Sequence, residues 1–112
     1  MKKLKLQNEV FKLFVVNYKE WLDILGYAES TVYALPIHLQ EFFYYLEQNH
    51  IKNINQITTK TVKEYYSYLQ QRANETRNGG LSKSYLNKHQ QALKKFKEYF
   101  IQFCTFMERL SL

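Results

Sequence analysis

The feature that most restricts the fold is the spacing of apolar residues, which recur every three or four positions in four segments. This spacing places the apolar side chains on one side of a helix, so it predicts amphipathic helices. Glycine and proline are scarce, at three and one, whereas all-β chains normally use more of both in turns. At 112 residues the chain is long enough for one hydrophobic core. We therefore expect a single all-α domain over residues 1–112, built as a four-helix bundle.

The first two predicted helices are separated by Gly26, a residue type that commonly ends helices. The apolar positions of the first helix are Val10, Phe11, Phe14, Tyr18, Trp21, Leu22 and Leu25. Those of the second helix are Val32, Leu35, Leu39, Phe42, Phe43 and Leu46. Pro36 falls inside the second pattern. Because proline removes a backbone donor, we expect a kink or a delayed start of the helix there.

A loop over Asn49–Ile57 precedes the third helix. This helix is expected to begin after Thr58, Thr59 or Thr61. A start after Thr58 keeps more of the apolar pattern inside the helix. The apolar positions of this helix are Val62, Tyr65, Tyr66, Leu69 and Ala73. Asn74–Leu81 contains two adjacent glycines and predicts a turn.

Ser82 predicts the N-cap of the fourth helix. Its apolar positions are Tyr85, Leu86, His89, Leu93, Phe96 and Phe100. The apolar residues from Ile101 onward either extend this helix or form a short fifth one.

The surplus positive charge is concentrated in one stretch of the chain. Between Arg72 and Lys97 there are seven basic residues and a single acid, Glu75, which leaves +6, the net charge of the whole protein. The remaining residues balance to zero. A neutral body with one basic segment is typical of a polyanion binder, because clustered cations on phosphates release counterions.

The outward side of the fourth helix is predicted to carry amides and lysines and few acids. Asparagine and glutamine can bind adenine edges, and lysine can reach guanine or phosphate. We expect Ser84, Asn87 and Gln91 at base edges, and Arg77, Lys83, Lys88, Lys94 and Lys95 at phosphates. Thr31 and Tyr33, near the start of the second helix, are expected as secondary contacts. A plain solvated face is the competing interpretation.

Enzyme chemistry finds little support in the sequence. His38, His50, His89 and Cys104 show no metal-ligand spacing, and His89 lies among apolar positions, which predicts a core histidine. No glycine-rich phosphate loop and no nucleophile with an adjacent base is evident. We therefore expect no catalytic residue, metal, cofactor or small-molecule substrate in this chain.

The single cysteine, Cys104, excludes an internal disulfide and fits a reducing compartment. No apolar run approaches the length of a membrane span, and polar residues interrupt the segment after the N-terminal lysines, where a signal peptide would be apolar. We expect a cytoplasmic protein that does not enter the membrane.

Four stretches together resemble a known family. They are NYKEWLDILGYAESTVYAL at Asn17–Leu35, LQEFFYYLE at Leu39–Glu47, INQITTKTVKEYYSYL at Ile54–Leu69 and LSKSYLNKHQQALKKFKEYF at Leu81–Phe100. In order and spacing they resemble the N-terminal core-binding (SAM-like) domain of phage-integrase-type tyrosine recombinases. The chain departs from that pattern at Ala28, where a serine commonly caps the second helix, and at Pro36 and Tyr85.

The resemblance implies a SAM-like orthogonal bundle in which the second helix opens at Thr31 and, with the fourth helix, lies across the major groove of duplex DNA. In such recombinases a larger C-terminal domain completes a clamp around DNA and cuts and rejoins strands. None of its catalytic residues can be mapped here, which implies a DNA-binding part without the catalytic domain. The implied partners are double-stranded DNA and other recombinase protomers, in site-specific recombination or integration.

Two alternatives remain open. A helix-turn-helix regulator would need two helices joined by a tight turn, and the Asn74–Leu81 connection is long for that. A helical protein-interaction module would instead use Tyr33, Ile37 and Tyr44 with the apolar C-terminal segment. Tyr33, Ile37 and Tyr44 could equally pack against the N-terminal segment or the loop over Asn49–Ile57.

Overall fold

Helices make up most of the computed structural model, which describes the backbone of residues 5–76 and 83–110 and the side chains of residues 5–71 and 86–105. In chain order they are α1 (Glu9–Ile24), α2 (Glu29–Gln48), the short 3-10 helix η1 (Ile54–Gln56), α3 (Thr59–Thr76) and α4 (Lys83–Leu110). No strand occurs within the described ranges. The prediction of an all-α, four-helix architecture is therefore confirmed.

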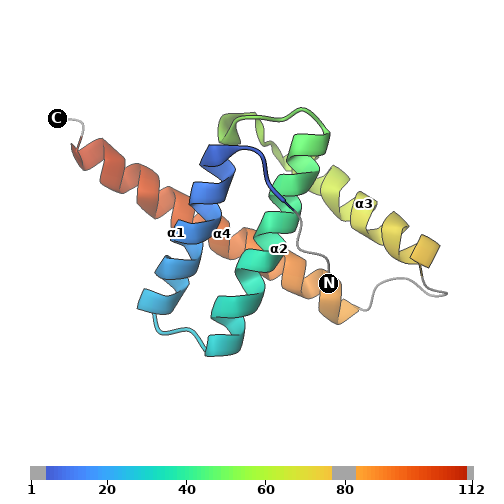
Figure 1. Cartoon of the computed structure of the whole chain (residues 1–112), viewed down its shortest axis with the longest axis horizontal. Helices are drawn as coiled ribbons and strands as arrows, with labels where there is room; N and C mark the ends of the chain where they lie inside the picture. The colour runs from blue at the N-terminus through green and yellow to red at the C-terminus, as the bar shows by residue number, and fades with distance from the viewer. Residues whose placement is uncertain (1–4, 77–82, 111–112) are drawn as a thin grey trace.

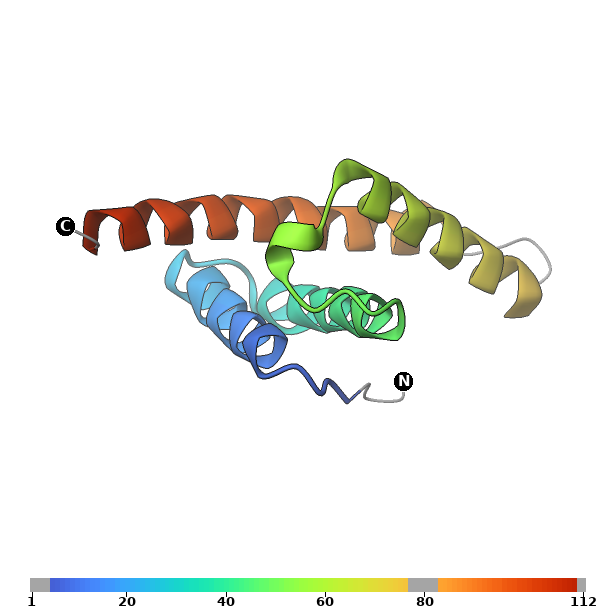
Figure 2. The same cartoon turned by 90° about the horizontal axis from the view of Figure 1, so that it is seen from above.

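The helices form two layers. α1 and α2 run antiparallel in one layer, and α4 crosses both of them in the second (Figures 1 and 2). α3 lies beside the N-terminal half of α4. Its Tyr65 contacts both neighbouring helices, because its ring centroid lies 4.9 Å from that of Phe42 and its hydroxyl lies 3.2 Å from Nδ1 of His89. The C-terminal end of α4 extends past the other helices (Figure 1).

The segment before α1 is tied to the end of α2. Asn8 caps α1, because its side-chain oxygen accepts from the N–H groups of Val10 at 2.9 Å and Phe11 at 3.2 Å. The backbone N–H groups of Gln7 and Asn8 donate to the carboxylate of Glu47, the shortest at 2.8 Å. These bonds fix the entry into α1 next to the end of α2.

α1 and α2 end in the same backbone motif, with one residue in the left-handed region. At the end of α1, Gly26 has φ +82°, its N–H donates to Asp23 O at 3.0 Å, and the next N–H reaches Leu22 O at 3.3 Å. At the end of α2, His50 occupies the equivalent position with φ +61°. Both are Schellman motifs, in which glycine is the preferred residue. The predicted role of Gly26 is confirmed.

α2 begins earlier than expected. Its first residue is Glu29, its N-cap is Ala28 without a side-chain cap, and Pro36 lies inside the helix. The expected delayed start at Pro36 is therefore wrong, as is the opening at Thr31, whose N–H already donates to Ala28 O at 2.9 Å. The physical reason is burial: six apolar positions of α2 lie in the core, and their packing outweighs one missing backbone donor.

α3 begins where the threonine pattern favoured it. The Thr58 and Thr61 side chains exchange hydrogen bonds with each other's backbone N–H at 3.2 Å, which makes Thr58 the N-cap. The helix continues to Thr76, so the first residues of the predicted Asn74–Leu81 turn are helical. The rest of that turn and the Ser82 cap lie outside the described residues.

The core is aromatic and confirms most predicted positions. The six predicted apolar residues of α2 are all buried, and the rings of Phe11 and Phe43 stack at 4.6 Å between centroids. Val10 and Leu25 are more than half exposed, contrary to the prediction. α1 packs against α2 and α4 on one side only, so the margins of its apolar stripe reach solvent.

α4 is one continuous helix, so the apolar segment after Ile101 extends it and does not form a fifth helix. No glycine or proline interrupts it, and Phe103 packs edge-on against Phe14 at 5.8 Å. Its most buried side also differs from the prediction. Ala92 and Tyr99 are buried, whereas the predicted Leu93 and Phe100 are half-buried and Tyr85 lies outside the described side chains.

Among the described residues, no helix is both long enough and apolar enough to span a bilayer.

Candidate nucleic-acid interface

The predicted contact residues in the middle of α4 do lie on one accessible side of the helix. Asn87, Lys88, Gln91 and Lys94 are all exposed, and spacings of three and four place them along one flank of α4. α4 forms its contacts with α1 and α2 on the other side (Figure 2). We call these four residues the α4 polar row. Two of them are amides and two are cations.

No carboxylate neutralises the lysines of the α4 polar row within the described residues. The ion pairs that involve lysine there join Lys12 to Glu9, Lys60 to Glu64 and Lys95 to Glu98, all within single helices. Lys97, one turn further along α4, is also exposed. This part of the surface therefore has a local excess of positive charge, which attracts phosphate groups.

Lys95 differs from the other lysines of α4. Its side chain is 27% exposed, and its Nζ lies 3.4 Å from Glu98 Oε2 and 5.3 Å from the centroid of the Tyr27 ring. A side-chain hydrogen bond with Tyr27 is the main cause that raises the pKa of Lys95, and Glu98 adds to it. Lys95 therefore joins α4 to the α1–α2 turn, and its cation is already engaged within the protein.

Thr31 and Tyr33 follow that turn on α2. Thr31 is half-buried in the first turn of the helix, whereas Tyr33 is 69% exposed. The Tyr27–Lys95 contact places the start of α2 on the Lys95 side of α4. Among the remaining predicted residues, Lys83 and Ser84 lie in the first turn of α4, but their side chains are outside the described set. Arg77 lies outside the described residues.

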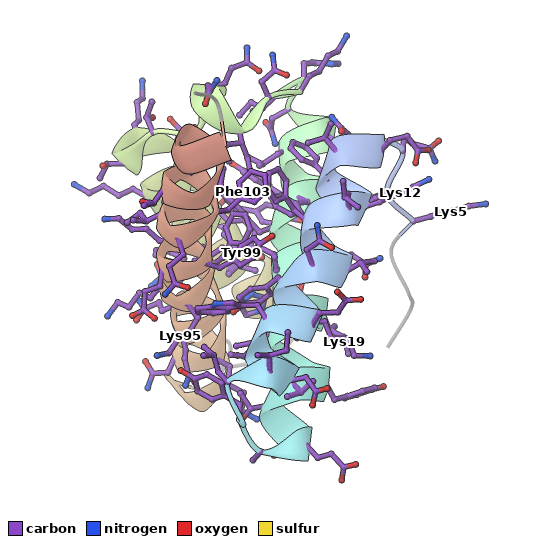
Figure 3. The ribbon with its side chains drawn as sticks, turned by 90° about the vertical axis from the view of Figure 1, so that its left-hand side faces the viewer. Lys5, Lys12, Lys19, Lys95, Tyr99 and Phe103 are labelled. Carbon is purple, nitrogen blue, oxygen red and sulfur yellow. The ribbon has the colours of Figure 1, made fainter. Side chains whose placement is uncertain are left out.

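Sequence reasoning missed a second group of lysines. Lys12 and Lys19 extend from the side of α1 that faces away from α4, and Lys5 extends from the segment before α1 on the same side. Tyr99 and Phe103 lie between α1 and α4 (Figure 3). The seven-residue spacing of the three lysines is visible in the sequence. Acids at Glu9, Glu20 and Asp23 share α1, so this region has a more balanced charge than the α4 polar row.

A buried polar cluster between α2 and α4 was also missed. His38, Glu41 and His89 are each less than 10% exposed, and His89 Nε2 lies 3.5 Å from Glu41 Oε2. Burial lowers the pKa of His38 below its usual value, although the nearby Glu41 acts in the opposite direction. The predicted core position of His89 is confirmed. The missed partner is Glu41, which the sequence places among apolar residues of α2.

Comparison with known proteins adds no relative. No protein-family model, no curated protein and no solved structure matches this chain.

Proposed function

We propose that this chain binds duplex DNA through the α4 polar row, as the core-binding domain of a tyrosine recombinase. The observation that carries the proposal is a combination of exposed amides with lysines that form no ion pair with any described residue. They are Asn87, Lys88, Gln91 and Lys94, on one flank of a long helix. Amides can form paired hydrogen bonds with base edges, and the lysines can neutralise phosphates. The recombinase assignment rests on the resemblance of the sequence stretches.

The long α4 fits this role in a second respect. Its C-terminal end extends beyond the bundle, and Ile101, which precedes that end, is 55% exposed. In a recombinase this end would meet the catalytic domain or a neighbouring protomer. The chain itself would position DNA and would not cut it, so binding and not strand cleavage is the property to measure.

Fluorescence anisotropy with a labelled duplex of mixed sequence tests the proposal. The test variant is Lys88→Glu/Lys94→Glu. The matched control is Lys5→Glu/Lys19→Glu, which changes the net charge equally, at one lysine before α1 and one on the side of α1 away from α4. Because Lys95 is engaged within the protein, about four phosphates should be neutralised, and the wild type should bind with a log–log salt slope of about −3 to −4. The test variant should lose about two units of that slope, and the control should retain most of it.

Equal losses in both variants would mean that binding follows net charge and not the α4 polar row, which contradicts the proposed interface. No measurable DNA binding by the wild type at low salt would contradict the proposed function.

A helical protein-interaction module is the second candidate, and a specific observation favours it. The outward side of α1 exposes Val10, Leu13, Val16 and Ile24, at 54%, 60%, 54% and 82% of their surface, and Tyr33 adds a fifth large exposed side chain. Exposed apolar patches often mark partner surfaces. Concentration-dependent assembly in size-exclusion chromatography, without DNA affinity, would favour this candidate.

A further inference from the structure

Three buried side chains that play no part in the proposed DNA contacts meet between α2 and α4. His38 and Glu41 are three residues apart and therefore share a side of α2, and His89 approaches them from α4. One potential ligand atom from each residue lies within 4.8 Å of the other two. The two imidazole rings are 4.3 Å apart between centroids. Residues distant in sequence thus bring two imidazole nitrogens and one carboxylate oxygen close together.

The surroundings of this cluster favour a positive charge at its centre. A carboxylate as buried as that of Glu41, 6% exposed, is costly in an apolar interior unless a cation compensates for it. A cation bound beside Glu41 and His89 can supply such a charge. Tyr65 lies on the opposite side of the His89 ring, with its hydroxyl 3.2 Å from Nδ1, which holds Nε2 toward Glu41. Metal-binding histidines are commonly oriented in this way by a second hydrogen bond.

We propose that His38, Glu41 and His89 form a binding site for one divalent transition-metal ion, with Zn²⁺ the best match. Zinc binds imidazole nitrogen and carboxylate oxygen at about 2.0–2.2 Å, so neighbouring ligand atoms in a tetrahedral site lie about 3.3–3.5 Å apart. The 3.5 Å distance between His89 Nε2 and Glu41 Oε2 matches that separation. A set with two nitrogens disfavours Mg²⁺ and Ca²⁺, which prefer oxygen ligands. A water molecule would take the fourth position.

Such an ion would join α2 to α4 across the core, and its effect is therefore on stability. A ligand that binds only the folded chain raises the melting temperature, by about 10 °C for a chain of this size at 100 times the dissociation constant. The proposal does not depend on DNA binding, so failure of one leaves the other intact.

The experiment uses untagged protein stripped with a chelator and then titrated with ZnCl₂ while thermal unfolding is followed by circular dichroism. The starting protein carries His50→Asn and Cys104→Ser, which remove the remaining histidine and the only thiol as competing ligands. Zn²⁺ should raise its melting temperature with one ion bound per chain in native mass spectrometry. Glu41→Gln, which preserves size but removes the charge, should lose most of this shift.

A second readout needs no variant of the cluster. Co²⁺ should give the visible absorption of a tetrahedral site, and Zn²⁺ should displace it. In nuclear magnetic resonance spectra of the wild type, Zn²⁺ should move the ring signals of His38 and His89 and leave those of His50 in place. An unchanged melting temperature, an equal shift in Glu41→Gln, or movement of the His50 signals alone would overturn the proposal and leave the cluster as a buried histidine–glutamate pair.

Discussion

The hydroxyl of Tyr18 donates a hydrogen bond to the backbone carbonyl of Ala92 at 3.0 Å, and both residues are completely buried. This bond joins α1 to α4 at the point where the two layers meet. The small side chain of Ala92 leaves room for the tyrosine ring to reach the backbone of α4. The ring also packs edge-on against Phe96, with centroids 5.8 Å apart.

Replacing Tyr18 with phenylalanine should lower the free energy of unfolding by about 0.5–1.5 kcal/mol, because the ring packing is retained and only the hydrogen bond is lost. Urea denaturation followed by circular dichroism measures the change. Tyr33→Phe is the matched control, since Tyr33 is 69% exposed, and it should change stability by less than about 0.5 kcal/mol. Equal losses would show that the Tyr18 hydroxyl contributes nothing specific.

The stability of the protein should fall as the pH rises above about 10, where tyrosines of the unfolded chain release their protons. Burial raises the pKa of Tyr18, Tyr66 and Tyr99, so the folded state retains protons that the unfolded state loses. Proton loss therefore stabilises the unfolded state, and the free energy of unfolding decreases with pH. Denaturation at pH 8, 10 and 11 checks the trend, which should be less steep in Tyr18→Phe. A flat profile would contradict it.

His50→Gly should stabilise the protein by about 1 kcal/mol, because His50 has φ +61°, a conformation that costs residues other than glycine about 1–2 kcal/mol. Gly26→Ala at the equivalent position of α1, with φ +82°, should destabilise it by a similar amount. Thermal unfolding of both variants gives the comparison. The idea fails if both substitutions shift the melting temperature in the same direction.

Glu47→Ala should release the segment before α1, because the N–H groups of Gln7 and Asn8 donate to its carboxylate. The loss should amount to about 1–3 kcal/mol, as expected for hydrogen bonds to a charged group. Hydrogen exchange should accelerate at the Gln7 and Asn8 amides. Glu20→Ala removes the same charge from the exposed side of α1 and should leave those amides protected.

Under the proposed DNA-binding function, neighbouring lysines of α4 should behave differently. Lys94→Met should reduce the salt slope of DNA binding by about one unit, because Lys94 is exposed and free to meet a phosphate. Lys95→Met should change the slope little, since its Nζ is held near Glu98 and Tyr27. Anisotropy titrations at several salt concentrations measure both. A larger effect from Lys95 would assign the phosphate contact to the wrong lysine.

Much of the fold follows from local chemistry and could be predicted. Apolar spacing located the four helices, Gly26 marked the end of α1, and Thr58 marked the start of α3, because periodicity, left-handed backbone and side-chain capping are all properties of short segments. The exposure of Asn87 and Gln91 followed in the same way from their position on a helix.

What the chain alone determined is therefore the set of helices and the segment that carries the positive charge. Only the tertiary structure decided which lysine is engaged, since Lys95 meets Tyr27 across the bundle. Only the tertiary structure also brings His89 next to His38 and Glu41, which precede it by about fifty positions in the chain. Contacts of this kind depend on how the two helix layers cross, and no short-range pattern specifies that angle because it results from the packing of the whole core.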